Sequence, residues 1–178
     1  IGYDLDSAEV ILHTGVTPNH RLNFATFERT WQRGNYWLLA MLPADHASAQ
    51  LDAFLYTKAS QDLLSTGQTK AALSALQTAT KQWPEYWLPY FLLGNHYFSA
   101  QPKLAANWFE QGLPAAQQQA AYLNNYALLL SSLACHEHAS DLINQALQLA
   151  PEDANLRDSQ QQIQQAQQDA QSGAQCQL

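Results

Sequence analysis

The residue types best suited to hold a metal ion stand together in one short stretch, Cys135-His136-Glu137-His138. Thiolate, imidazole and carboxylate groups are the usual ligands of zinc. Structural zinc sites take their ligands in pairs from two separated segments, whereas these four residues are adjacent. The stretch also falls where a turn between two helices is expected, and polar residues are ordinary there. We therefore predict no metal site and no cofactor.

The cysteines and the other histidines form no second chemical motif. Cys135 and Cys176 are too few for a disulfide framework or a metal quartet, and they leave the redox compartment open. Nucleophilic catalysis by cysteine needs an imidazole and a third group that orients it. Cys135 lies in the expected turn and Cys176 in a glutamine-rich tail, so neither is predicted to be catalytic. We interpret His13 and His20, which flank Thr-Gly-Val-Thr-Pro, as loop histidines.

The composition favours a protein partner over nucleic acid or an anionic membrane. The 178 residues include 8 Lys and Arg against 15 Asp and Glu, with a net charge of -7 and no basic cluster. Binding to phosphates or anionic lipid needs such a cluster. No apolar run approaches the length of a transmembrane helix. Because the chain opens on Ile1 inside an expected strand, we expect a fragment of a longer protein.

Residues 1–43 differ in character from those that follow. IGYDL and EVILHTG are β-prone segments separated by Asp6-Ser7, which predicts two neighbouring strands. FATFERTWQRG has three aromatic residues at helical spacing before Gly34, and NYWLLAML is predicted to be a buried strand. Four elements are too few to cover a sheet, so we predict the last part of an α+β domain. Residues 44–52 are expected to be a linker.

From residue 53 onward the sequence repeats with a period of about 34 residues. The tetratricopeptide signature has an aromatic residue, Leu-Gly and Tyr on one helix, then Ala-x3-aromatic and a closing Pro on the next. The first part is matched by four residues of one segment: Tyr90, Leu93, Gly94 and Tyr97. The second part occurs twice with the same offsets: Ala72, Leu76, Ala79 and Pro84, then Ala139, Ile143, Ala146 and Pro151.

The predicted fold is therefore mainly α-helical, a tetratricopeptide helical-hairpin solenoid preceded by a partial α+β segment. Its three units are 53–86, 87–119 and 120–153, followed by a capping helix at 153–170 and a disordered tail at 171–178. Small residues at equivalent places, such as Gly94, let paired helices approach each other closely. The alternative is an Ala/Leu-rich helical bundle without repeats.

The expected binding surface is the concave face of the stacked units, which the first helix of each unit lines. On each first helix, one side faces away from the packing within its unit and is expected to line this surface. The residues on these sides are Phe54, Thr57, Lys58, Gln61, Leu64, Leu88, Phe91, Leu92, Asn95, Phe98, Ala121, Asn124, Asn125, Leu128 and Ser131. The centre is apolar, and Lys58 is the only cation, which disfavours capture of a C-terminal carboxylate. The set suits a protein or peptide with apolar side chains, or the chain's own N-terminal domain.

The N-terminal segment resembles the C-terminal part of papain-like cysteine peptidase domains related to bacteriocin (double-glycine) leader peptidases. In that family a strand of the form His-x-x-V-V-x-G-Y-D carries the catalytic His, and a second strand, a Phe-x3-Trp helix and a final strand follow. Ile1-Gly2-Tyr3-Asp4 is similar to the end of the His strand, and Phe27 with Trp31 to the helix. One lineage of this family joins such a domain to C-terminal tetratricopeptide repeats.

The resemblance implies that the catalytic Cys and His precede Ile1, and that His13 and His20 would lie near their cleft. The orienting Asp, usual after the second strand, is replaced in Leu12-His13-Thr14-Gly15. We expect the chain alone to be an interaction module without peptidase activity. Two alternatives stay open: an active parent peptidase whose repeats recruit substrate, or a structural scaffold whose groove is filled by the N-terminal domain. The resemblance favours a bacterial envelope location, with a cytoplasmic one also open.

Overall fold

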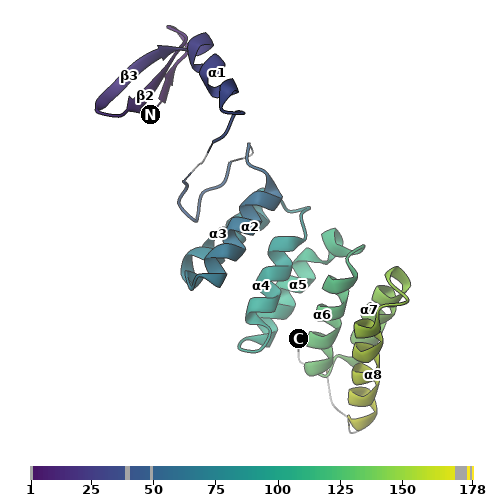
Figure 1. The fold of residues 1–178 in the computed structure, drawn as a ribbon. Coiled ribbons are helices and arrows are strands. Elements are labelled where there is room, and N and C mark those ends of the chain that lie inside the picture. Colours follow the sequence, from purple (N-terminus) through teal and green to yellow (C-terminus); the bar gives the residue numbers. More distant parts are fainter. Residues whose placement is uncertain (1, 39–40, 49, 171–175, 177) are drawn as a thin grey trace. The chain divides into compact units, whose positions relative to one another are not determined.

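The structure is a computed structural model that describes residues 2–38, 41–48, 50–170, 176 and 178. The chain divides into two compact units, Ile1–Met41 and Leu42–Leu178. The first unit contains strands and one helix, and the second contains helices (Figure 1). Within the described ranges, no helix combines the length and the apolar character that crossing a bilayer would require.

The first unit is a three-stranded antiparallel sheet followed by a helix. The strands β1 (Gly2–Asp4), β2 (Glu9–Thr14) and β3 (Thr17–Asn23) are neighbours in chain order. Helix α1 (Phe24–Arg33) begins where the Asn23 side chain accepts a hydrogen bond from the Ala25 amide, which satisfies a free N–H of the first turn. The two strands and the helix expected over this segment are confirmed.

Strand β3 was not predicted, because the sequence around it was interpreted as a loop. Gly15 and Val16 form a two-residue connection, so that Thr14 pairs with Thr17 and β3 runs back along β2. Gly15 has a φ of +53°, which glycine adopts without the clash that a side chain would cause. His13 and His20 therefore lie on the two arms of a hairpin.

The prediction of a buried strand over NYWLLAML is wrong for its described residues. Asn35 and Tyr36, the first two residues of the run, both have positive φ, so the chain is not extended there. The next side chains are exposed, at 74% for Trp37 and 89% for Met41. An apolar run becomes a strand only where a neighbouring strand satisfies its backbone groups, and none pairs with these residues. Residues 39 and 40 lie outside the described ranges.

The first unit has no buried core among its described residues. Tyr3 and Leu5, in and beside β1, are about as exposed as side chains on a free surface. A three-stranded sheet needs an apolar face packed against something to be stable by itself. The described residues of this unit show no such packed face.

The second unit is a series of antiparallel helix pairs (Figure 1). The pairs and the helix that follows them are α2 (Ala53–Ser65) with α3 (Thr69–Gln82), α4 (Leu88–Tyr97) with α5 (Pro102–Ala116), α6 (Ala120–Ser132) with α7 (His136–Leu149), and α8 (Ala154–Asp169). Aspartate side chains cap the N-termini of α2 and α8. The carboxylate of Asp52 accepts a hydrogen bond from the Leu55 amide, and that of Asp153 accepts one from the Asn155 amide. The predicted three hairpins and their capping helix are present.

The first helices of the pairs form an inner row that α8 continues. Helix α2 contacts α4, α4 contacts α6, and α6 contacts α8. Among the described residues, no Cα atom of α3 lies within 8 Å of α5, and none of α5 lies within 8 Å of α7. First helices that touch while second helices do not give a stack that curves toward the first helices. The inner face of α2, α4, α6 and α8 is therefore the concave face.

Two glycines allow the helices of the middle pair and its neighbour to approach closely. A Cβ atom on Gly94 would lie 2.6 Å from Cε2 of Phe109, and one on Gly112 would collide with Tyr90 and with the Tyr122 hydroxyl. The Phe109 ring cannot retreat, because it is fully buried and stacks on Tyr126 with 5.4 Å between ring centroids. The match of Gly94 to the repeat signature thus has a steric cause.

Replacing Gly94 by alanine should lower the free energy of unfolding by about 1–3 kcal/mol, the usual cost of overpacking a core. This result is expected although alanine favours a helix by about 1 kcal/mol. Urea unfolding followed by circular dichroism measures the change. Adding Phe109→Leu to the Gly94→Ala variant should recover part of the loss. A Gly94→Ala protein as stable as the parent would show that Phe109 adapts.

Candidate functional site

The centre of the inner face is built from one side of α4 and the facing side of α6. Helix α4 contributes Leu88 and Leu92, which are half-buried and do not belong to the buried core cluster. Phe98, next to the end of α4, and Leu128, on α6, are also half-buried, but they pack against that cluster. The structure therefore places an apolar strip over the middle two helices of the row.

Phe91 has two roles where the sequence suggested one. Its ring lies 5.8 Å from that of Tyr122 and 6.3 Å from that of Phe109, and it also contacts Trp87. These contacts join the second pair of helices to the third, while part of the side chain stays accessible. A substitution of Phe91 would therefore change stability together with any binding.

Three asparagine amides form a connected chain beside the apolar strip. The Nδ2 atom of Asn125 donates to Oδ1 of Asn95 at 2.9 Å, which links α6 to α4. The Nδ2 atom of Asn124 donates to Oδ1 of Asn125 at 3.3 Å. The Oδ1 atom of Asn124 is buried and has no hydrogen-bond partner among the described residues, which is uncommon for a buried acceptor.

The part of the row formed by α2 is more polar and more open. Phe54 is 55% exposed, and Lys58 and Gln61 are also exposed. The prediction that Thr57 lines the surface is wrong, because its side chain is fully buried and its hydroxyl donates to the Ala53 carbonyl at 2.7 Å. Threonine satisfies its hydroxyl within its own helix in this way, so that the residue can face the core.

Both basic side chains of the inner row are paired with carboxylates. Lys58 and Arg157 are the only Lys or Arg residues in α2, α4, α6 and α8. Nζ of Lys58 lies 2.6 Å from the Asp62 carboxylate, and Nη2 of Arg157 lies 2.8 Å from that of Glu152. The row thus offers apolar and amide groups but no free cation for a carboxylate.

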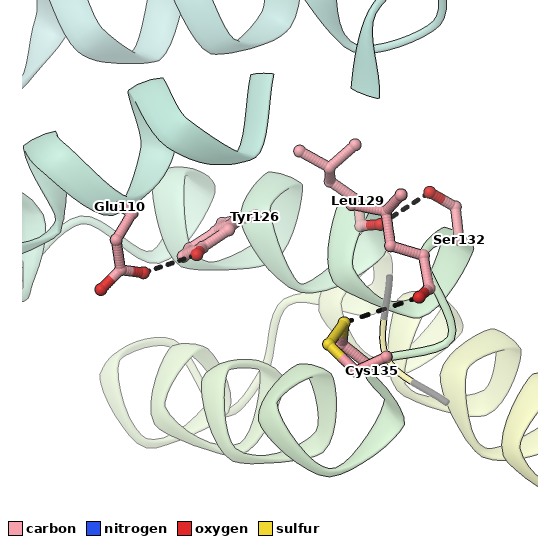
Figure 2. The surroundings of a disulfide bond; sticks show 7 residues. Glu110, Tyr126, Leu129, Ser132 and Cys135 are labelled. Atoms are coloured by element: carbon pink, nitrogen blue, oxygen red, sulfur yellow. Dashed lines mark hydrogen bonds between the residues drawn. A yellow bond between two sulfur atoms is a disulfide. The ribbon is translucent and has the colours of Figure 1, made fainter. Parts of the chain in front are cut away.

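Two buried tyrosines hold α6 against α5 behind this surface. The hydroxyl of Tyr122 donates to the Phe109 carbonyl at 2.7 Å, and that of Tyr126 donates to the Glu110 carboxylate at 2.6 Å (Figure 2). Burial raises the pKa of both phenols well above the ordinary value, and the bond to Glu110 raises the pKa of Tyr126 further. Both therefore stay protonated donors, which keeps the central helices in fixed positions.

The two cysteines are bonded to each other, a pairing that was not predicted from the sequence. Cys135 and Cys176 form a disulfide, with 4.4 Å between their Cα atoms (Figure 2). The disordered tail expected over 171–178 stays a prediction, since 171–175 and 177 lie outside the described residues, and the disulfide ties Cys176 to the third helix pair. The described residues contain no group of three or more His, Cys, Asp or Glu side chains arranged to hold a metal.

Comparison with known proteins places the chain by its fold. No protein-family model and no curated protein matches it. It is similar to the first TPR domain of Spaghetti (RPAP3) bound to the HSP90 peptide SRMEEVD, with a TM-score of 0.59 and 15% identity over 68% of this chain and 96% of that one. It is also similar to the first TPR domain of human RPAP3, with a TM-score of 0.57 and 14% identity over 64% and 91%. The helical part of the chain therefore has the tetratricopeptide fold.

Proposed function

We propose that the inner row of α2, α4, α6 and α8 binds an extended polypeptide segment that carries apolar side chains and little negative charge. The observation that carries this proposal is the apolar strip over α4 and α6, bordered by the asparagine chain and without a free cation. The concave face of a tetratricopeptide stack is a usual site for such contacts.

The apolar strip supplies the expected affinity. Leu88 and Leu92 are half-buried on α4 without belonging to the packed core, and the accessible parts of Phe91 and Phe98 border them. A ligand side chain that covers this surface would gain about 1.5–3 kcal/mol if fully buried. Two or three such side chains are enough for a specific complex of moderate affinity.

The asparagine chain supplies the expected orientation. An extended segment has unpaired backbone N–H and C=O groups, which need partners when they leave water. An amide side chain donates and accepts at once, so it can pair with both kinds of group. The Nδ2 atom of Asn95 makes no hydrogen bond with any described residue, and it lies at the end of the amide chain that begins at Asn124.

The charge of the row separates this ligand from the one bound by the solved relative. The peptide SRMEEVD has two glutamates and a terminal aspartate. In this chain Lys58 and Arg157 each already contact a carboxylate of a nearby residue. Desolvating those acidic groups without a free cation would be unfavourable. We infer that the present row prefers uncharged segments.

The test compares two probe classes on the full chain by fluorescence anisotropy. Uncharged hexapeptides with alternating Leu or Phe should bind, and SRMEEVD should bind at least about tenfold more weakly. Leu92→Ser should weaken binding of the hexapeptides by about tenfold or more.

Leu149→Ser is the matched control, because Leu149 is an exposed leucine on the outer helix α7. It should leave hexapeptide binding unchanged. Tighter binding of SRMEEVD than of the hexapeptides, or equal effects of the two leucine variants, would overturn the proposal.

We further propose that the first unit is the last part of a papain-like α+β domain and has no hydrolytic role of its own. The order of β1, β2 and α1, with Phe27 and Trp31 on the helix, supports the resemblance, whereas β3 between β2 and α1 and the absence of a final strand among the described residues depart from it. A cysteine peptidase needs a free thiolate, and both cysteines of this chain share one disulfide. Cleavage of a double-glycine peptide by the chain alone would contradict this proposal.

A further inference from the structure

The disulfide joins the turn before α7 to the segment after α8. Cys135 is buried and immediately precedes the first residue of α7, whereas Cys176 is exposed. The two residues are 41 positions apart, and the loop that their bond closes contains the whole of α7 and α8. The bond therefore encloses the second helix of the last pair together with the capping helix.

The path of the chain explains how distant residues meet. Gln167, near the end of α8, lines a cavity of about 280 Å³ together with Cys135, His136 and Cys176. The end of α8 thus lies beside the start of α7, as expected for two antiparallel helices of similar length.

Apart from the disulfide, helix α8 is held by packing against its neighbours on one side of the stack. Its buried residues are Leu156, Ser159 and Ile163, and one of these is polar. The rest of the helix is rich in glutamine and mostly accessible to solvent. Within the part of the chain that the structure describes, it packs against α6 and α7 only. End units of solenoids open most easily because they have a neighbour on one side only.

We propose that the Cys135–Cys176 disulfide is a redox-dependent strap that fastens α8 onto the last helix pair. When the bond is present, α8 stays tethered through Cys176 to the turn between α6 and α7. When it is reduced, α8 is held only by its few buried side chains, and it opens far more often. The capped form of the row therefore belongs to an oxidising compartment, where such bonds persist.

The positions of the two sulfurs favour one order of events in reduction by an external dithiol. A thiolate of the dithiol attacks Sγ of Cys176, the exposed residue of the pair, a new S–S bond forms there, and the Cys135–Cys176 bond breaks. Sγ of Cys135 leaves with the electron pair at the start of α7, where the helix N-terminus stabilises a thiolate, which then takes a proton. The second thiol of the dithiol displaces Cys176, so the dithiol is oxidised to a disulfide and both cysteines are reduced.

Hydrogen–deuterium exchange of the full chain, with and without dithiothreitol, tests the strap. Reduction should speed exchange in α8 and the adjoining part of α7 by at least about tenfold, and it should leave α2 and α3 unchanged. Cys176→Ser should exchange at the faster rate whether or not the reductant is present. This variant changes an exposed residue, so it avoids the packing defect that a change of the buried Cys135 would introduce.

Leu178→Ser is the control, since it alters another exposed side chain of the same segment and should keep the response to reductant. Two free thiols in protein equilibrated with oxidised glutathione would overturn the proposal. Exchange in α8 that is equally slow before and after reduction would also overturn it.

Discussion

Replacing Phe109 by alanine should lower the free energy of unfolding by about 3–5 kcal/mol, the usual cost of removing a buried aromatic ring. The ring is fully buried, stacks on Tyr126 and meets the edge of Tyr122 at 5.2 Å. It also fills the space that Gly94 leaves open on α4. The cavity would therefore lie where two helix pairs join, and urea unfolding of the full chain measures the loss.

Phe54→Ala is the matched control for this prediction, because Phe54 is 55% exposed on α2. It should change stability by no more than about 0.5 kcal/mol. Since units of a solenoid contact only their neighbours, the Phe109 variant should lose its protection in α4 to α7 first. A loss below about 1 kcal/mol would show that the aromatic cluster repacks around the cavity.

The helical part of the fold was predictable because its packing fixes residue types at fixed intervals. Gly94 matched the repeat signature, and the structure places Phe109 of the paired helix directly against it. Such a pair recurs with the period because each helix pair solves the same packing problem. The period alone therefore gave the order and the approximate bounds of the helices.

The N-terminal unit was less predictable because a strand depends on a partner that sequence periodicity does not reveal. The run NYWLLAML has the residue types of a strand but lacks a pairing neighbour among the described residues. Conversely, β3 has few apolar residues, and it exists because a two-residue turn at Gly15 brings it beside β2. The signal was present in the glycine between two β-prone threonines.

The Cys135–Cys176 disulfide was not predicted, because the number of cysteines alone does not show which of them lie close together. Cys135 and Cys176 are far apart in sequence, and the second stands in a glutamine-rich tail. Two antiparallel helices of 14 and 16 residues return the chain to its starting point, which brings the cysteines together. Combining the helix lengths with the cysteine positions would have predicted the bond.

The order of the helices in the inner row was predictable, and the contacts between their side chains were not. Helices α4 and α6 do form the middle of the row, while the predicted binding residues stay a prediction. The hydrogen bond between Asn95 and Asn125 and the burial of Thr57 depend on the rotation of each helix, which the spacing leaves open. The spacing also did not show that the Phe91 ring packs against Tyr122 while part of the side chain stays accessible to solvent.

The stability of the chain should fall steeply as the pH rises above about 10, the ordinary pKa of tyrosine in an unfolded chain. Burial raises the pKa of Tyr122 and of Tyr126 in the folded chain, so both phenols keep their protons there while the unfolded chain releases its own. The contribution of these two tyrosines to the free energy of unfolding is therefore fully present below pH 10. Above pH 10 it falls by about 1.4 kcal/mol per pH unit for each tyrosine. Urea unfolding at pH 8 and pH 11 should differ by about 3 kcal/mol from these two residues.

The variant Tyr126→Phe should remove about half of the part of the alkaline loss that Tyr122 and Tyr126 cause, because it deletes one of the two phenols whose pKa rises most. It should also lower stability at pH 8, since the Glu110 carboxylate then loses its 2.6 Å donor. Tyr3→Phe is the control, because Tyr3 is largely exposed and its removal should leave the alkaline loss unchanged. An undiminished loss in a Tyr122→Phe, Tyr126→Phe double variant would show that other groups, and not these donors, keep α6 seated on α5 at high pH.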